Sequence, residues 1–266
     1  MTGTQGEFSD RERAAVYRVM FERRDVRRNF LPTPIPDDVL LRVLTAAHHA
    51  GSVGFMQPWD FVVIRDRATK RAVKGLFTKA NADAATRYTG AKSDLYRSLK
   101  LEGIEEAPIN LCVTCSRHRG GPHVLGRATV RATDLYSTCC AVQNLWLVAR
   151  AEGIGVGWVS ILDHEALKRV IKVPKSVTVV AYLCLGYVSK FEMRPDLETA
   201  GWRARTPVEQ LIHDESWGNR RLQKGRNGDA DHQGLYENGG RGKNKAGRRT
   251  AGMERQSARR RVRNGR

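Results

Sequence analysis

The sequence predicts an α+β or mixed α/β fold, in which helices pack around one sheet. Short runs rich in Val, Ile, Tyr and Phe predict strands, and longer runs with apolar residues at three- and four-residue spacing predict helices. The helical runs cover more of the chain than the strand runs. With 266 residues, the chain has room for one large domain or two small ones.

The first expected element is a helix over residues 10–23. Asp10 is its candidate N-cap, but Arg13 stands where a capping box needs Glu, so the box is incomplete. Three prolines within residues 31–36 then remove backbone donors and predict an extended connector. The apolar stripe of the helix consists of Val16, Val19 and Met20.

A second helix is expected from about Pro36 to Ala50. Asp37 and Asp38 favour its N-terminus, and Gly51 follows its end. The apolar run at residues 61–65 then predicts a short buried strand.

Residues 66–106 are expected to be mostly helical. Within them, residues 78–98 are polar, Ala-rich and weakly patterned, which suits a mobile lid, although a plain solvated helix pair fits the same composition. A strand is expected at 109–115, and the glycines and proline of 117–131 predict a loop.

Residues 132–152 form the longest apolar helix candidate. Apolar residues surround most of the helix, which predicts burial in a core or between subunits. Gly153 follows where a left-handed C-terminal residue belongs. Strands are then expected at 156–161 and 177–187, with a helix at 163–171 between them.

We expect a flexible N-terminus (1–8), a folded domain (9–218) and a basic tail (219–266), which its charge and composition set apart. The tail carries 15 Lys and Arg against 4 Asp and Glu, whereas the rest carries 31 against 24. Too few large apolar residues remain in the tail to offset the entropy of ordering it, so we expect disorder there. A tail that binds nucleic acid or another anionic surface is the alternative.

Composition also predicts a soluble cytoplasmic protein. The first 15 residues are polar and charged, unlike a signal peptide, and no apolar run approaches the roughly 18 residues that cross a bilayer. Five cysteines lie in apolar runs, which predicts buried free thiols in a reducing compartment. These are Cys112, Cys115, Cys139, Cys140 and Cys184.

Four arginines surround one carboxylate, Asp25, in residues 22–30. The guanidinium fork matches phosphate oxygens, so this density of Arg suits a phosphate site, although a solvated charged face also fits. Asp25 either spaces the arginines as a salt-bridge partner or acts as a base beside a bound anion. The four arginines are Arg23, Arg24, Arg27 and Arg28.

Other motifs favour structural interpretations. Gly153, Gly155 and Gly157 follow a helix and precede a strand, which is the reverse of a dinucleotide-binding turn and indicates a tight connection. No second pair of ligands accompanies the Cys112–Cys115 spacing, so we expect no metal site. Ser160 lacks the glycines of a hydrolase nucleophile elbow.

Three segments together resemble the flavin-binding segments of the nitroreductase-like flavoprotein family: residues 22–30, 52–59 and 153–160. The resemblance spans roughly residues 8–218. Asp25 stands where general nitroreductases commonly carry Ser, which makes the chain similar to the oxygen-dependent branch of this family.

The resemblance implies a domain-swapped homodimer with a central mixed or antiparallel sheet and flavin mononucleotide (FMN) at the subunit interface. Residues 78–98 would be the lid over the site. The implied cofactor-binding residues are Arg23, Arg24, Arg27 and Arg203 near the phosphate, Ser52, Met56 and Gln57 lining the flavin pocket, and Gly157 and Trp158 at the ring edge.

The implied reaction takes reduced FMN as substrate and molecular oxygen as co-substrate. It yields 5,6-dimethylbenzimidazole, the lower ligand of vitamin B12, and requires a flavin reductase to supply reduced FMN. Asp25 and Ser160 match the catalytic residues of this branch. An NAD(P)H-dependent flavin, nitro or corrinoid reductase is the alternative, and a nucleic-acid-binding protein acting through the tail is an alternative of another class.

Overall fold

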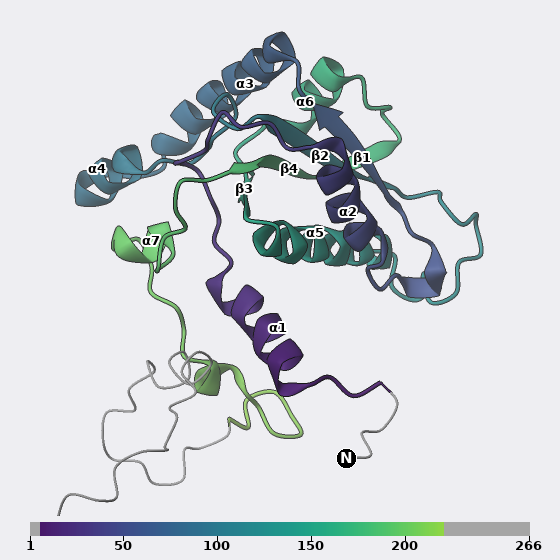
Figure 1. Cartoon of the computed structure of the whole chain (residues 1–266). Coiled ribbons are helices and arrows are strands. Elements are labelled where there is room, and N and C mark those ends of the chain that lie inside the picture. Colours follow the sequence, from purple (N-terminus) through teal and green to yellow (C-terminus); the bar gives the residue numbers. More distant parts are fainter. Residues whose placement is uncertain (1–5, 221–266) are drawn as a thin grey trace, which may run out of the picture.

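The computed structural model describes residues 6–220, and the rest of the predicted basic tail lies outside the described residues. Four strands form one antiparallel sheet in the order β1-β2-β4-β3 (Figure 1). This confirms the predicted α+β class, and of the mixed or antiparallel sheet that the resemblance implies, the structure has the antiparallel form. The strands are β1 (Trp59–Ile64), β2 (Ile109–Ser116), β3 (Ile154–Trp158) and β4 (Val177–Tyr187).

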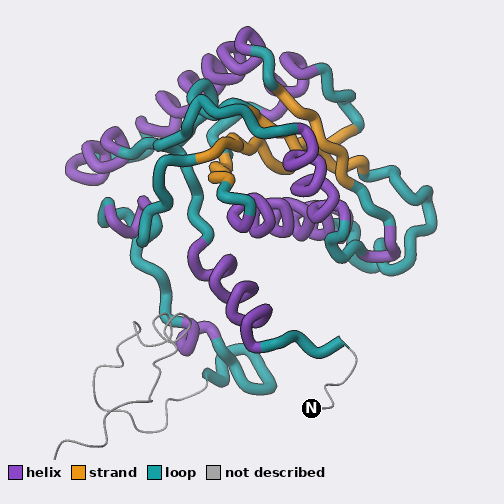
Figure 2. Tube along the Cα trace, in the orientation of Figure 1, coloured by secondary structure: helices purple, strands orange, loops and turns teal. Residues whose placement is uncertain are grey.

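Seven α-helices and two short 3-10 helices accompany the sheet within residues 6–220 (Figure 2). The helices expected at 10–23, 36–50, 132–152 and 163–171 are present with ends shifted by one or two residues, whereas the stretch expected to be mostly helical over 66–106 ends at Ser98. The described helices are α1 (Asp10–Glu22), α2 (Asp37–His48), α3 (Arg67–Ala85), α4 (Gly90–Ser98), α5 (Thr133–Ala151), α6 (His164–Ile171) and α7 (Asp196–Thr199), with η1 (Val53–Phe55) and η2 (Val208–Leu211).

Each face of the sheet packs against its own pair of helices. The core on one side joins the sheet to α2 and α5, and the core on the other side joins it to α3 and α6. Alternating residues of β2 serve the two cores, since Leu111 and Val113 face α2 and α5 whereas Cys112 faces α3 and α6. Both faces are thereby buried along β2, whereas the edge strand β1, expected to be buried, is only half-buried over residues 61–63.

A β-bulge in β4 changes which residues face each core. Val113 pairs with Ala181 but Thr114 pairs with Val179, so Val180 is an extra residue on β4. Ala181 therefore packs with α2 and α5, whereas Val179 packs with α3 and α6. Without the bulge, these two residues would face the same side.

Two local expectations need correction, and one is confirmed. The N-cap of α1 is Ser9, whose hydroxyl accepts from the Glu12 N–H while the Glu12 carboxylate accepts from Ser9, so a complete capping box is present. The strand expected at 156–161 is β3, which begins at Ile154. Gly153 has the predicted left-handed backbone, with φ of 76°.

The expectation that all five cysteines are buried is wrong for Cys139 and Cys140, which are exposed on α5. They lie on the face of α5 turned away from the sheet. Burial raises the pKa of the Cys112 thiol to about 12 and raises the pKa of Cys184 as well, so these two thiols stay protonated.

Helix α1 extends away from the sheet like an arm (Figure 1). No residue of α1 is buried, and the apolar side chains of Val16, Tyr17 and Met20 remain 43%, 56% and 47% exposed. Its apolar stripe therefore does not join the core of this chain. In the described part of the chain, no helix is long and apolar enough to span a membrane.

Candidate active site

The arginine-rich segment lies along the outer edge of β3. The Val26 N–H donates to the Val156 carbonyl at 2.9 Å, and Asp25 forms a parallel bridge with Val156. Residues 25 and 26 thus extend the sheet beyond β3. This pairing places the Asp25 side chain at the end of β3, next to Trp158.

Gly155 and Gly157 allow residues 25 and 26 to pack closely against β3. A Cβ at Gly157 would lie 2.0 Å from the Val26 carbonyl oxygen, and a Cβ at Gly155 would lie 3.0 Å from a Val26 methyl group. The glycines therefore serve close packing, as the sequence indicates. They pack against Val26, which is part of the candidate site.

Asp25 is held at both carboxylate oxygens. Its Oδ1 accepts from the Trp158 N–H at 2.9 Å, and its Oδ2 forms an ion pair with Arg27. The Asp25 side chain is 29% exposed and that of Arg27 is 13% exposed. Burial raises the pKa of Asp25, although Arg27 and the Trp158 N–H oppose the shift. A purely ion-paired surface carboxylate would instead have a lowered pKa.

The neighbouring arginines lack carboxylate partners. Within residues 6–220, neither Arg23 nor Arg24 has a carboxylate at ion-pair distance. The Arg23 guanidinium lies 4.6 Å from the Trp146 ring centroid, and Arg24 donates to the Phe21 carbonyl at 2.7 Å and to the Met193 carbonyl at 2.5 Å. Burial lowers the pKa of both guanidinium groups. Such desolvated cations favour an anionic ligand.

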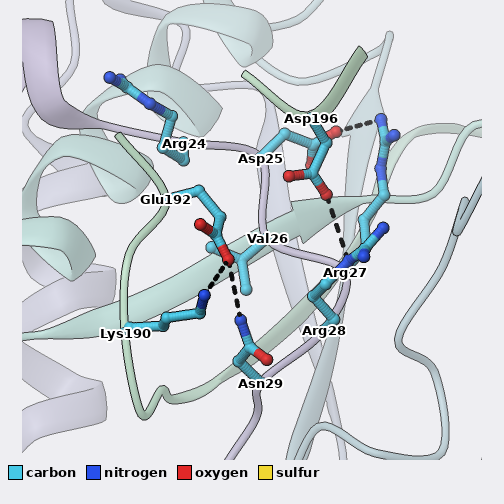
Figure 3. A pocket seen from close by; sticks show the side chains of 9 residues that line it. All are labelled: Arg24, Asp25, Val26, Arg27, Arg28, Asn29, Lys190, Glu192 and Asp196. Atoms are coloured by element: carbon cyan, nitrogen blue, oxygen red, sulfur yellow. Dashed lines mark hydrogen bonds and ion pairs between the residues drawn. The ribbon is translucent and has the colours of Figure 1, made fainter. Parts of the chain in front are cut away.

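Buried donors without partners support the same conclusion. The Nε atoms of Arg24 and Arg27 are buried and make no hydrogen bond within the described part of the chain. In Figure 3 the Arg24 side chain points away from the Asp25–Arg27 pair, and Arg28 lies beside Asp196. The segment therefore has two sides, with Arg24 on one and the Asp25 ion pair on the other.

Arg205 is a cation that sequence reasoning missed. Its positive charge contributes to lowering the pKa of both Arg23 and Arg24, so its guanidinium lies near theirs. Arg203 and Arg205 are both exposed, but the predicted Arg203 is not among the main charges that shift either pKa. Since Arg205 stands in a polar stretch without any pattern, only the folded chain could reveal it.

The second predicted segment, residues 52–59, is held in its conformation by contacts within its own loop. The Ser52 hydroxyl accepts from the Gln57 N–H at 2.8 Å, and Met56 is buried. Gln57 has a left-handed backbone with φ of 45°, which the Ser52 contact stabilises. A Cβ at Gly54 would lie 2.7 Å from the Leu125 carbonyl oxygen, so the loop packs closely against residues 117–131.

Within one chain, this loop does not meet the arginine segment. The Val53 N–H donates to the Ser137 hydroxyl near the start of α5, whereas the Trp146 Nε1–H donates to the Arg24 carbonyl in its second half. Nine residues of helix separate these contacts, or about 14 Å along the axis at a rise of 1.5 Å per residue. Ser52, Met56 and Gln57 therefore lie apart from Arg23, Arg24 and Arg27.

The remaining predicted residues cluster at the end of β3. Gly157 and Trp158 contact the segment of Asp25 directly. Ser160 follows two residues after Trp158, is exposed, and makes no side-chain hydrogen bond within residues 6–220. The described residues contain no cluster of His, Cys, Asp and Glu that could hold a metal ion.

Comparison with known proteins identifies related sequences. The model of the nitroreductase family matches residues 20–187. A 5,6-dimethylbenzimidazole synthase of Rhodospirillum rubrum is 43% identical over 185 residues, which cover 70% of this chain and 87% of the relative. Another of that name from Rhodobacter capsulatus is 38% identical over 202 residues, covering 76% of this chain and 97% of the relative.

Solved structures share the fold. A BluB-like flavoprotein from Clostridium difficile 630 superposes with a TM-score of 0.57 at 20% identity, covering 74% of this chain and 97% of its own. An oxidised iodotyrosine deiodinase bound to FMN and 3-iodo-L-tyrosine superposes with a TM-score of 0.56 at 20% identity, covering 66% and 91%.

Proposed function

The chain belongs to the nitroreductase family, and from this premise we propose that it converts reduced FMN and molecular oxygen to 5,6-dimethylbenzimidazole, the lower ligand of vitamin B12. The observation that carries the proposal is the position of Asp25. It combines a raised pKa with contacts to Arg27 and Trp158, and it directly follows two desolvated arginines, Arg23 and Arg24, which have no carboxylate at ion-pair distance within residues 6–220. Relatives at 36–43% identity bear the name of this activity.

The residues of the site suit FMN. Arg23, Arg24 and Arg205 would hold the phosphate, because their positive charges lie close together and, within residues 6–220, the Arg24 Nε is a buried donor without an acceptor. The backbone of Gly157 and Trp158 would meet the edge of the ring system. Bound reduced flavin would supply the electrons and the carbon skeleton of the product.

We assign proton transfer to Asp25 and a positioning role to Ser160. The Trp158 N–H and Arg27 both donate to the carboxylate, which favours its ionised form against the effect of burial. Asp25 is thus suited to accept a proton from a bound substrate. The Ser160 hydroxyl, which is free to rotate, would orient the reacting part of that substrate.

We further propose that the active unit is a domain-swapped homodimer with FMN at the interface. The flavin-pocket loop at residues 52–57 and the arginine segment contact α5 nine residues apart, at Ser137 and Trp146, and a second copy would bring one of each together. Apolar surface suited to such an interface is exposed on α1 and on the outer face of α5, where Tyr136 is 60% exposed.

The proposed reaction is tested by aerobic incubation of the protein with reduced FMN, followed by chromatography for 5,6-dimethylbenzimidazole. We expect product above a control without enzyme. Oxidised FMN alone, together with steady consumption of NAD(P)H by the protein, would contradict the proposal and indicate a flavin, nitro or corrinoid reductase.

Replacing Arg24 with Ala is expected to weaken binding of oxidised FMN by about 10- to 100-fold, since charge-assisted hydrogen bonds contribute roughly 1.5–3 kcal/mol. Quenching of flavin fluorescence measures the dissociation constant. Arg169→Ala, an exposed change on α6, is the control and should leave the constant unaltered. Equal affinities in the two variants would remove Arg24 from the phosphate site.

Introducing two carboxylates on the arm, by Tyr17→Glu together with Met20→Glu, is expected to convert a dimer into a monomer and to abolish FMN binding. Burying these charges in an apolar interface is strongly unfavourable. Sedimentation velocity measures the assembly state. Ala72→Glu on the exposed face of α3 adds a carboxylate elsewhere and should preserve the dimer. A dimer in the arm variant would contradict the proposed interface.

A further inference from the structure

Helix α4 is attached to the molecule through very few side chains. It projects from the end of α3 and lies near α7 at one side of the molecule (Figure 1). Tyr96 is its only buried residue. The Tyr96 ring stacks on Tyr88 with a centroid distance of 4.8 Å, and its hydroxyl donates to Asn81 Oδ1 of α3 at 2.7 Å.

Trp202, from a distant part of the chain, completes this attachment. Its ring meets Tyr88 edge-on at 5.4 Å and lies 6.1 Å from Tyr96. The Lys92 ammonium lies 3.5 Å from the Trp202 ring centroid and donates to the Trp202 carbonyl at 3.3 Å. We call Tyr88, Lys92, Tyr96 and Trp202 the aromatic clasp.

The segment that carries Trp202 also contacts the arginine segment. Residues 188–202, here called the strap, leave β4 and pass beside residues 24–29. Arg24 donates to the Met193 carbonyl at 2.5 Å, and Arg28 pairs with Asp196 at 3.5 Å. The strap therefore connects the arginine segment, which it contacts at Met193 and Asp196, to α4, which it contacts at Trp202.

A backbone hydrogen bond connects the end of the strap, which carries Trp202 of the clasp, to α7. The backbone N–H of Trp202 donates to the Leu197 carbonyl at 2.8 Å, so the backbone of Trp202 is tied to the helix that contains Asp196. Arg205 follows three residues later and lies near Arg23 and Arg24. A ligand that contacts these arginines would thus restrain both ends of the segment that bears Trp202.

We propose that Trp202 is a positioning residue, which couples the closure of α4 to occupation of the arginine site. With the clasp formed, α4 is held against the strap, and an anion at the arginines fixes the strap in turn. Because such coupling is reciprocal, closing α4 must also strengthen anion binding. The identity of the anion as FMN rests on the proposed function, whereas the clasp itself does not.

Amide hydrogen exchange of residues 90–98 tests the proposal, measured without ligand and with oxidised FMN. Trp202→Ala is expected to accelerate exchange roughly tenfold without ligand, since aromatic and cation–π contacts of this kind change an opening equilibrium by about that factor. FMN should protect α4 in the wild-type chain and fail to do so in the variant. Trp202→Phe should restore part of the protection, because it keeps an aromatic ring.

Trp217→Ala is the matched control. Trp217 is 92% exposed and contacts His213 rather than α4, so its removal should leave exchange of α4 unchanged. Wild-type exchange in Trp202→Ala would overturn the clasp, and persistent protection by FMN in that variant would overturn the coupling. Failure of the wild-type chain to bind FMN would contradict the proposed function instead, while the exchange without ligand still decides the clasp.

Discussion

Replacing Asp25 with Asn is expected to lower the rate of 5,6-dimethylbenzimidazole formation by about 100-fold or more, because positioned proton transfer contributes roughly 10²–10⁴-fold to enzymatic rates. Asn keeps the size of the side chain and can still accept from the Trp158 N–H, which stabilises the local backbone. It cannot accept a proton at working pH. Binding of oxidised FMN should therefore remain within about threefold of wild type, since that binding rests on the arginines.

The pH dependence of the reaction rate is a second test of the role of Asp25. Burial raises the pKa of Asp25 above its ordinary value, and a proton acceptor works only when ionised. The wild-type rate should fall as the pH decreases through this raised pKa, at a higher pH than an ordinary Asp, near 3.9, would give. Asp25→Asn should lack this acid limb. A single-turnover assay with reduced FMN across pH measures both effects.

Asp37→Asn is the matched control, since it removes another carboxylate paired with an arginine, Arg65, at a distance from β3. Its rate should equal that of the wild-type chain. Full product formation by Asp25→Asn would remove Asp25 from catalysis and make it a spacer between arginines. Loss of FMN binding in that variant would instead indicate a structural role.

The elements with strong local patterns could be predicted from the sequence, but those held by distant contacts could not. The apolar strand at 177–187 has the expected bounds. Residues 99–106, expected to continue a helix, form none. There the buried Glu102 carboxylate accepts from Ile104 N–H at 2.7 Å and pairs with Lys74, while Asn110 donates to the Ile104 carbonyl at 3.0 Å. These contacts override the local propensity for helix.

The residues of the candidate site divide in the same way: those adjacent in the sequence could be predicted, whereas contacts between distant segments could not. The arginine segment and Asp25 could be recognised because they are adjacent in the sequence, and their types suit an anion. The approach of Asp25 to Trp158 depends on the pairing of residues 25 and 26 with β3, which no local pattern encodes. The exposure of Cys139 likewise depends on which face of α5 the sheet covers. Local patterns identify residue types, whereas packing decides which of them meet.

Replacing Gly157 with Ala is expected to abolish product formation and to weaken FMN binding at least tenfold, although the residue has no side chain to contribute. The added Cβ would lie 2.0 Å from the Val26 carbonyl oxygen, so residues 25–27 must move away from β3. That shift breaks the contacts of Val26 with Val156 and of Asp25 with Trp158. Overpacking of this kind costs roughly 1–3 kcal/mol of stability.

The same Gly→Ala substitution at three positions separates displacement of the Asp25 segment from a general loss of stability. At Gly155 the Cβ would meet side-chain methyl groups, 2.7 Å away on Val188 and 3.0 Å away on Val26, and these can partly yield. At Gly75 on α3 nothing lies within 4 Å, and Ala is the better helix former by about 1 kcal/mol. Thermal unfolding, FMN affinity and product formation should therefore be damaged most at Gly157, less at Gly155, and not at Gly75. Wild-type affinity and rate in Gly157→Ala would mean that the Asp25 segment does not need its place on β3, and the geometry proposed for proton transfer would be wrong.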